Sequence, residues 1–497
     1  MNVVTLLDIV AGVDPDRVAL GDARSGMTLS ELRDRAARAA TLLADQPGRP
    51  LLFAATATAA FPVAMFGAAA AGRPFAPVSY RLAAEPFAEL VRRQSPTTLI
   101  ADARTAGQVD PGEVPTVQET PAFVSAVESA VPAEQEPDQD PERPAVLLHT
   151  SGTTGTPKVA VLRHRHLTSY VLNSTDMLAA GPDEAALVSV PPYHIAGVAG
   201  LLTGIYSGRR IVQLPNFDAD AWVDAAVQQD ITHAMVVPTM LARIVEVLEQ
   251  RGVGLPMLRH LSYGGGRMPL PVIQRALALL PHVDFVNAYG LTETTSSVAV
   301  LGPADHRAAI TSADPAVRRR LGSVGRPLPD VEIVVRDAVG APLPPDTKGE
   351  LWIRGPQVSG EYATASVVDP DGWFPTQDGG WVDEDGYVFV EGRLDDVIIR
   401  GGENLSPGEI EDVLAKHPAL EEAAVYGEPD EQWGEVVVAA VVVRAGAVVD
   451  EQELKEWVSQ HLRSSRVPAR VEFLSELPRN DLGKLLRRVL KAPVPSP

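Results

Sequence analysis

The sequence predicts an α/β protein of several structural units, the last of them a small α/β unit at the C-terminal end. The chain has 497 residues, and a typical unit of about 150 residues gives a prior of roughly three units. Short apolar, β-branched runs alternate with amphipathic patterns up to about residue 130, which is typical of parallel strands covered by helices. Valine-rich runs then return between about 423 and 443, which indicates a further sheet.

Within the first part, residues 29–43 are predicted to form a helix because their apolar residues share one face. These residues are Leu29, Leu32, Ala36, Ala39 and Leu43. The uncharged run 51–72 is long enough to raise the question of a membrane span. Its alanines, its threonines and Pro62 favour instead a buried strand over 51–55 and a buried helix over 62–71. Residues 131–144 are acidic and proline-rich, and are expected to form a surface connector.

The charge and cysteine content narrow the possible partners. Acidic residues outnumber basic ones 64 to 43, for a net charge of −21, which disfavours nucleic acid and anionic membranes. No cysteine is present, so disulfides, thiolate metal sites and a cysteine nucleophile are excluded, and a cytoplasmic location is expected. Residues 1–20 contain no basic residue before Arg17 and do not resemble a secretory signal. Oligomeric state is left open between monomer and homodimer.

A loop rich in hydroxyls and glycines, residues 149–158 (HTSGTTGTPK), lies between apolar runs at 145–148 and 159–162 that are predicted to be strands. Glycines allow close backbone approach, hydroxyls and N–H groups donate to phosphate oxygens, and Lys158 adds positive charge. The spacing is not that of a Walker A loop. A polar hairpin turn is the alternative, although two residues would suffice for it. The residues expected to bind phosphate are Thr150, Ser151, Gly152, Thr153, Thr154, Gly155 and Lys158.

This loop resembles that of the adenylate-forming (ANL) superfamily, which includes acyl- and aryl-CoA ligases, acyl-AMP ligases, the adenylation domains of peptide synthetases, and luciferases. The resemblance covers essentially residues 10–490. It implies an N-terminal domain over 1–394, with two αβαβα-type sheets and a distorted β-barrel, and a mobile C-terminal lid over 395–497. It also implies a hinge at Asp395, where element-terminal residues absorb the backbone rotation.

Residues 287–294 (NAYGLTET) resemble a nucleotide-binding segment of the superfamily. The resemblance implies that Tyr289 stacks on adenine, that Thr292 meets the α-phosphate and that Glu293 helps to hold Mg²⁺, a hard cation that takes few carboxylates. Asn287, Ala288 and Gly290 belong to the same segment. In isolation, a core tyrosine and a surface glutamate would be the favoured interpretation.

The triglycine loop at 264–266 resembles the loop that lies against the adenine in the superfamily. Close contact with the adenine would explain why the residues at these positions, Gly265 and Gly266, are small. The next residue, Arg267, is larger than the residue usual there, so its role is open.

The motif at 191–197 (PPYHIAG) resembles the segment that lines the carboxylate-substrate pocket. It implies a gating role for His194 and pocket positions at Ala196, Gly197 and Gly264, although a packing role for a lone histidine is the simpler interpretation. Amino-acid-activating domains carry an aspartate here, and this chain has none between Tyr193 and Ile195. An α-ammonium would be left unpaired. The expected substrate is therefore a carboxylic acid without a free α-amino group. Residues 196–200 (AGVAG) are all small or aliphatic, which suggests an apolar acyl, alicyclic or aryl acid.

Two later segments resemble ribose-binding motifs. Asp378 can accept both ribose hydroxyls, and Arg393 can donate to the hydroxyls or to phosphate. Two departures accompany them: Gln377 stands where a glycine is usual, which is expected to narrow the space beside the ribose, and Val159 replaces the glycine common after the loop lysine.

In the C-terminal part, Gly401 and Gly402 are expected to line the path of a thiol after the lid turns. Residues 406–409 (SPGE) predict a capping box that opens a helix through about residue 416. Strands are expected at 423–426, 435–443 and 470–474, and a helix near 451–462.

The last motif, residues 478–484 (PRNDLGK), resembles one whose lysine is catalytic, which gives that role to Lys484. A carboxylate that attacks the α-phosphate of ATP brings two anions together at about 3 Å, and a positioned ammonium with Mg²⁺ lowers their repulsion.

The resulting hypothesis is an AMP-forming acyl-CoA synthetase that uses ATP, Mg²⁺ and coenzyme A with a small carboxylic acid. One alternative is an acyl-AMP ligase that loads an acyl carrier protein. An amino-acid-activating domain and a luciferase-type oxygenase are disfavoured. A non-catalytic AMP-binding sensor is a further alternative, against which the retention of Glu293 and Lys484 speaks.

Overall fold

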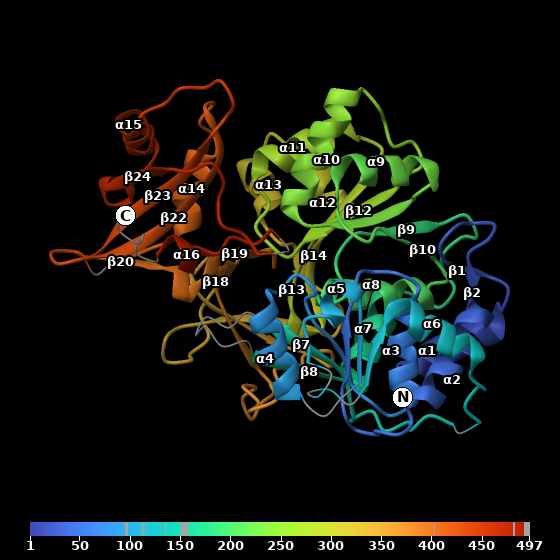
Figure 1. Ribbon diagram of the computed structural model, residues 1–497. Coiled ribbons are helices and arrows are strands. Elements are labelled where there is room, and N and C mark those ends of the chain that lie inside the picture. The colour runs from blue at the N-terminus through green and yellow to red at the C-terminus, as the bar shows by residue number, and fades with distance from the viewer. Residues whose placement is uncertain are drawn as a thin grey trace.

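The computed structural model describes residues 1–94, 98–110, 112, 114, 116–134, 136–150, 158–401, 403–480 and 483–491. Within these residues the strands form four sheets. Figure 1 shows a large body that contains the chain from its N-terminus to beyond residue 350, with the orange and red C-terminal unit beside it. The α/β class and the division into a large and a small part are as the sequence predicts.

The first sheet has six strands in the order β6-β5-β3-β4-β7-β8. All neighbours are parallel except β7 and β8, so the predicted parallel layers are confirmed. The strands are β3 (Leu51–Ala54), β4 (Phe75–Pro77), β5 (Thr98–Ala101), β6 (Thr116–Glu119), β7 (Pro144–Thr150) and β8 (Lys158–Arg163). The helices of this region are α1 (Val4–Val13), α2 (Leu29–Leu43), α3 (Ala60–Ala70), α4 (Ala84–Gln94), α5 (Ala103–Ala106), α6 (Thr120–Ser129) and α7 (His164–Ser174).

Two local predictions in this region are confirmed. Helix α2 has the predicted bounds and opens with a capping box, in which Thr28 and Glu31 each bond the other's backbone N–H. The uncharged run forms β3 and α3, and nearly every residue of the two is buried in the core. Among the described residues no helix is long and apolar enough to cross a membrane.

The second sheet has nine strands in the order β15-β14-β13-β12-β11-β9-β10-β1-β2. Its strands are β1 (Val18–Leu20), β2 (Met27–Thr28), β9 (Ala185–Val188), β10 (Arg210–Gln213), β11 (His233–Val236), β12 (His260–Gly264), β13 (Asp284–Leu291), β14 (Ser296–Leu301) and β15 (Arg326–Pro327). Its helical segments are α8 (Ile195–Tyr206), α9 (Ala219–Gln228), α10 (Pro238–Arg251), α11 (Leu270–Leu279), α12 (Pro303–Thr311), α13 (Pro315–Arg319) and the short η1 (Thr292–Thr294) and η2 (Arg320–Gly322).

The central strands of this sheet run parallel from β10 to β13. Their carboxyl ends therefore meet at one edge, where β11 leads into α10, β12 into the triglycine loop and β13 into η1. This edge holds two of the segments that the sequence analysis predicts to bind nucleotide, the triglycine loop and residues 287–294.

The third sheet is antiparallel, in the order β16-β17-β18-β19. It consists of β16 (Glu332–Arg336), β17 (Gly349–Arg354), β18 (Phe374–Val382) and β19 (Val388–Arg393). This four-stranded sheet is the part of the N-terminal domain for which the sequence analysis expected a distorted β-barrel.

The C-terminal sheet packs on its own apolar core, which includes Ile398, Ile410 and Val437. Its strands are β20 (Ile398–Arg400), β21 (Glu403–Leu405), β22 (Leu420–Asp430), β23 (Gly434–Val443) and β24 (Arg470–Phe473). The helical segments are η3 (Leu394–Asp396), α14 (Pro407–Leu414), α15 (Glu451–His461), η4 (Ser464–Arg466) and α16 (Arg487–Leu490).

Two details of the C-terminal prediction are wrong. The Ser406 side chain makes no capping bond at the start of α14. The Glu409 N–H donates instead to the Ser406 backbone carbonyl oxygen at 3.2 Å, and the Glu409 carboxylate accepts from Arg466 at 3.3 Å. Strand β22 runs from Leu420 to Asp430 rather than over 423–426, since it pairs along its length with β23. In β22, pairing with a long neighbouring strand thus overrides local sequence preference.

Candidate active site

The phosphate-loop prediction falls on the turn between β7 and β8. The two strands are antiparallel, and Thr150 pairs with Lys158 at their end, so the predicted strands on both sides of the loop are confirmed. The Thr150 hydroxyl donates to the Lys158 carbonyl oxygen at 3.4 Å. Ser151, Gly152, Thr153, Thr154 and Gly155 lie outside the described residues, so their phosphate-binding role stays a prediction.

Lys158 is joined to Glu293 through a tyrosine that the sequence analysis did not name. The Lys158 ammonium lies 5.1 Å from the ring centre of Tyr362, within the range of a cation–π interaction. The Tyr362 hydroxyl donates to Glu293 Oε1 at 2.7 Å. Burial and the nearby carboxylate raise the pKa of Tyr362, so the phenol keeps its proton and remains a donor. Only tertiary structure brings residues 158, 293 and 362 together, and no local motif marks Tyr362.

Glu293 is held in a fixed position in η1. It is buried, and its backbone carbonyl oxygen accepts from the N–H groups of Ser359 and Gly360 at 2.8 and 3.0 Å. Thr292 precedes it in the same short helix. No group of three or more possible metal ligands occurs in the part of the chain that the structure describes. A metal at Glu293 would therefore depend on phosphate oxygens and water for its other ligands, which suits Mg²⁺.

The glycines around β12 and β13 have different structural reasons. A Cβ atom on Gly290 would overlap the Ser296 carbonyl group, 2.5 Å from its carbon, and one on Gly264 would overlap the carbonyl oxygen of Ala288. Gly265 has a φ of +78°, a left-handed conformation that favours glycine. Gly266 has room for a Cβ atom, 3.8 Å from Pro238, so the structure requires its small size less strictly.

At the ribose-binding candidates, Tyr289 and Asp378 are in direct contact. The Tyr289 hydroxyl donates to Asp378 Oδ2 at 2.6 Å, and Arg393 pairs with Asp378 at 3.3 Å from the facing position on β19. Burial raises the pKa of Asp378, and Arg393 opposes this rise. Burial also raises the pKa of Tyr289 well above its usual value. Asn287, on the same strand as Tyr289, donates to the Ser323 carbonyl oxygen at 3.0 Å.

Gln377 adopts an unusual backbone conformation beside this cluster. Its φ is +60°, and its N–H donates to Glu350 at 3.0 Å. The residue is exposed. At Gln377, which departs from the family pattern, the structure shows a strained left-handed backbone rather than steric crowding. The narrowing of the space beside the ribose stays a prediction.

At the expected acid-binding motif, His194 is the residue before α8. Its ring packs on Tyr193 with centroids 4.5 Å apart, and Tyr193 in turn meets the edge of Tyr80 at 5.4 Å. A Cβ atom on Gly197 would lie 2.6 Å from the Pro191 carbonyl oxygen, so the turn itself requires this glycine. Ala196 is partly exposed and is the better candidate for substrate contact.

Lys484 lies within electrostatic reach of these groups although it belongs to the C-terminal unit. Burial and Arg393 lower its pKa, and three carboxylates, Asp378, Asp396 and Glu293, oppose the fall. Lys484 is exposed to solvent, although protein atoms surround it closely enough to lower its pKa. The preceding Gly483 packs so closely on Thr239 of α10 that a Cβ atom would overlap the threonine hydroxyl.

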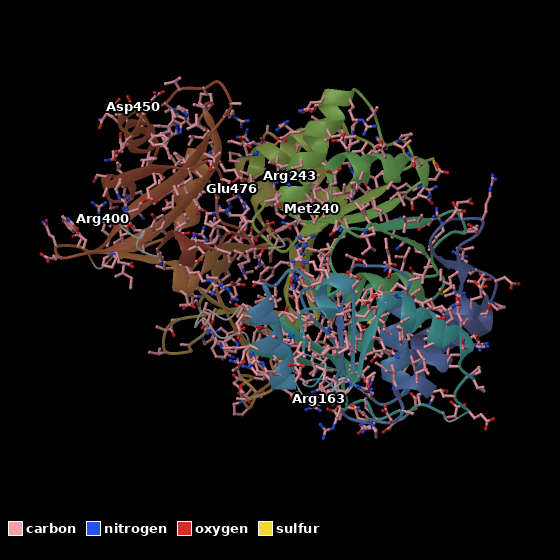
Figure 2. All side chains as sticks on the ribbon, in the orientation of Figure 1. Arg163, Met240, Arg243, Arg400, Asp450 and Glu476 are labelled. Carbon is pink, nitrogen blue, oxygen red and sulfur yellow. The ribbon has the colours of Figure 1, made fainter. Side chains whose placement is uncertain are left out.

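Figure 2 shows the side chains on the two sides of this junction. Glu476, shortly before the Lys484 turn, and Arg243, on α10, are labelled there. Arg267, in the triglycine loop, also reaches the C-terminal unit, where it forms an ion pair with Asp412 of α14.

Arg487 fixes the Lys484 segment to the rest of the C-terminal unit, and the sequence analysis missed it. It pairs with Asp396 at 3.1 Å and with Glu411 at 2.5 Å, and it donates to the Val425 carbonyl oxygen at 3.0 Å. Asp395, the expected hinge, is exposed in η3 beside this network. Gly401 has a φ of +59° and donates its N–H to the Trp433 carbonyl oxygen at 2.7 Å. Gly402 lies outside the described residues.

Comparisons with known proteins identify the family of this chain. Residues 7–363 match the family model described as AMP-binding enzyme, and residues 409–484 match that of the AMP-binding enzyme C-terminal domain. A feruloyl-CoA synthase from Amycolatopsis sp. is 33% identical, with 96% of each chain covered. A fatty acid–[acyl-carrier-protein] ligase, ScoC, from Streptomyces coeruleorubidus is 35% identical, with 86% of this chain and 83% of that protein covered.

A solved structure supports the same relationship. The o-succinylbenzoate CoA synthetase MenE from Bacillus subtilis, in complex with its acyl-adenylate intermediate, superposes with a TM-score of 0.84 at 27% identity, covering 98% of each chain. The same enzyme has also been solved in complex with ATP and a magnesium ion. The chain thus belongs to the AMP-binding enzyme family, in the acyl- and aryl-CoA ligase branch of the adenylate-forming superfamily.

Proposed function

We propose that this protein is an AMP-forming acid–thiol ligase, which activates a carboxylic acid as acyl-AMP and then transfers the acyl group to coenzyme A. One observation carries the proposal. Gly483 packs against Thr239 of α10, which brings the next residue, Lys484, to the large body, where the charges of Asp378, Arg393 and Glu293 affect its pKa. The only lysine in the final motif is thus brought to the residues that are candidates for ribose and metal binding.

In the first half-reaction, the carboxylate oxygen attacks the α-phosphorus of ATP and pyrophosphate leaves. Asp378 and Arg393 would hold the ribose, and the Lys484 ammonium would offset the repulsion between the two anions. Glu293, fixed by Tyr362, is the residue that would hold Mg²⁺, which lowers the charge on the phosphate oxygens when bound. Gly265 and Tyr289 would form the adenine site.

In the second half-reaction, the thiol of coenzyme A loses its proton, attacks the acyl carbonyl carbon and displaces AMP. The C-terminal unit would turn about Asp395 between the two steps, so that Lys484 withdraws and Gly401 with Gly402 line the thiol path. The boundary between residues 394 and 395 remains part of this proposal. Support comes from its place between β19, the last strand of the third sheet, and β20, the first strand of the C-terminal sheet.

The proposed substrate is an apolar acyl, alicyclic or aryl acid. Tyr193, His194 and Ile195 supply no carboxylate for an α-ammonium, and an unpaired ammonium in a partly buried site is unfavourable. The relatives differ in the acid and in the acceptor, since one is a feruloyl-CoA synthase and another a fatty acid–[acyl-carrier-protein] ligase. The latter supports a carrier protein as a second candidate acceptor.

The two half-reactions can be tested separately. Lys484→Ala is expected to reduce acid-dependent pyrophosphate exchange by several orders of magnitude, while thiolysis of supplied acyl-AMP by coenzyme A survives. Lys491→Ala, an exposed lysine seven residues along, is the matched control and should leave both steps intact. Equal loss of both steps in Lys484→Ala would contradict the assignment. Hydroxamate trapping over aliphatic, alicyclic and aryl acids, followed by acyl transfer to coenzyme A or to a carrier protein, identifies the substrate and the acceptor.

A further inference from the structure

We infer that Arg267 and Asp412 form a latch between the two bodies that favours the arrangement for acyl-AMP formation and must open for thioester formation. Arg267 is then a positioning residue that acts through the C-terminal unit. The inference rests on the proposed function, because it assigns the contact to one of two half-reactions.

The contact is built on one face of α14. Gly408 and Asp412 are four residues apart, and therefore neighbours on the same side of the helix. The Arg267 guanidinium forms an ion pair with the Asp412 carboxylate. A Cβ atom on Gly408 would lie 3.1 Å from the central guanidinium carbon of Arg267 and would overlap one of its nitrogens. Glycine in a helix is less favourable than alanine by about 0.5–1 kcal/mol, and here its missing side chain makes room for the arginine.

Arg267 helps to keep the partly buried Asp412 carboxylate ionised. Burial raises the pKa of Asp412 and adjacent Glu411 raises it further, whereas Arg267 and Lys416 lower it. The Arg267 and Asp412 side chains are 45% and 38% exposed. Such half-exposed pairs contribute about 0–1 kcal/mol, a strength that can bias a lid and still be broken in every catalytic cycle.

The same arrangement brings Lys484 to the nucleotide-binding candidates. Arg267 contacts the lid at α14, and Thr239 contacts it at Gly483, next to Lys484. Rotation of the lid about Asp395 would carry Asp412 away from Arg267 and Gly483 away from Thr239 together. The latch therefore stabilises only the arrangement in which Lys484 is docked, and it contributes nothing to the second arrangement.

Asp412→Asn tests the latch without altering the nucleotide-binding body. We expect pyrophosphate exchange to fall about 3- to 5-fold, the effect of a half-exposed ion pair, while thiolysis of supplied acyl-AMP is unchanged or faster. The exchange of the two charges, Arg267→Asp with Asp412→Arg, should recover part of the loss. Arg275→Ala removes a comparable surface pair with Glu249, whose side chains are 39% and 42% exposed, and should change neither step.

Other outcomes would overturn the inference. If Arg267 served only to bind nucleotide, Arg267→Ala would raise the KM for ATP and Asp412→Asn would behave as wild type. An equal effect of Asp412→Asn on both half-reactions would indicate general destabilisation instead of a latch.

A measurement of lid position removes the dependence on activity. The chain has no cysteine, so Val227→Cys and Val448→Cys, at positions that are 49% and 93% exposed on the two bodies, can carry a single pair of spin labels. With ATP and Mg²⁺ but no acid, Asp412→Asn and Gly408→Ala should both depopulate the distance that dominates in the labelled parent. Identical distributions would refute the latch and leave the ligase assignment, which Lys484→Ala tests, untouched.

Discussion

Removal of the Tyr362 hydroxyl is a sharp test of how this site holds Glu293. Tyr362→Phe keeps the ring that lies under Lys158 but deletes the 2.7 Å hydrogen bond to Glu293. A hydrogen bond to a charged group is worth about 1.5–3 kcal/mol. Tyr362 is only partly buried, so the lower end applies, which corresponds to roughly a tenfold change.

The loss should appear in the magnesium dependence of the first half-reaction. With Glu293 less firmly oriented, we expect the Mg²⁺ concentration for half-maximal pyrophosphate exchange to rise about tenfold, while thiolysis of supplied acyl-AMP remains near wild type. Tyr170→Phe, on α7, is the control for loss of a tyrosine hydroxyl elsewhere. Unchanged magnesium dependence in Tyr362→Phe would refute both the role of Tyr362 and the assignment of the metal to Glu293.

Three further predictions concern the glycine at β13, the strained glutamine and the proposed catalytic lysine. Gly290→Ala should lower the free energy of unfolding by at least about 2 kcal/mol, because the new Cβ atom would meet the Ser296 backbone. The control Gly12→Ala, which has open space around the new Cβ atom, should leave Tm unchanged or raised. Equal Tm values for the two variants would show that the β13 backbone can shift. Gln377→Gly should raise the free energy of unfolding by up to about 1 kcal/mol in denaturant titration, since it relieves a φ of +60°, and a loss of stability would show that the Gln377 side chain makes a stabilising contact. Because the pKa of Lys484 is lowered from 10.5, its ammonium should lose its proton below that pH, and pyrophosphate exchange should decline as the pH rises through this lowered pKa. Lys484→Arg, which stays protonated, should lack this alkaline decline. The same decline in both proteins would assign it to another group.

The sequence was sufficient for the parts that depend on local pattern. Helix α2 follows from apolar spacing, and the buried pair β3 and α3 follows from an uncharged run broken by Pro62. The nucleotide-binding candidates were found because glycines, hydroxyls and charged residues occur in short segments with a recognisable order. At Gly265 the structure supplies the physical reason, a left-handed backbone.

The residues that sequence reasoning missed are those whose function arises from distant contacts. Tyr362 meets Glu293 across 69 positions, and Arg487 meets Asp396 across 91. The role of Arg267 was open in the sequence because its partner, Asp412, is 145 positions away. The capping box predicted at Ser406 is absent: the Glu409 N–H donates to the Ser406 backbone carbonyl oxygen, and the Glu409 carboxylate accepts from Arg466.

By itself, therefore, the sequence determined the α/β class, the order of the segments and the chemistry each can offer, because helix periodicity, strand patterning and loop composition are local properties. Only the tertiary structure decided which charges meet. The parallel strands of the second sheet bring the triglycine loop and Glu293 to one edge, and the C-terminal unit packs Gly483, next to Lys484, against Thr239 of α10. Electrostatic interactions depend on separation in space and on burial, and neither is fixed by separation along the chain.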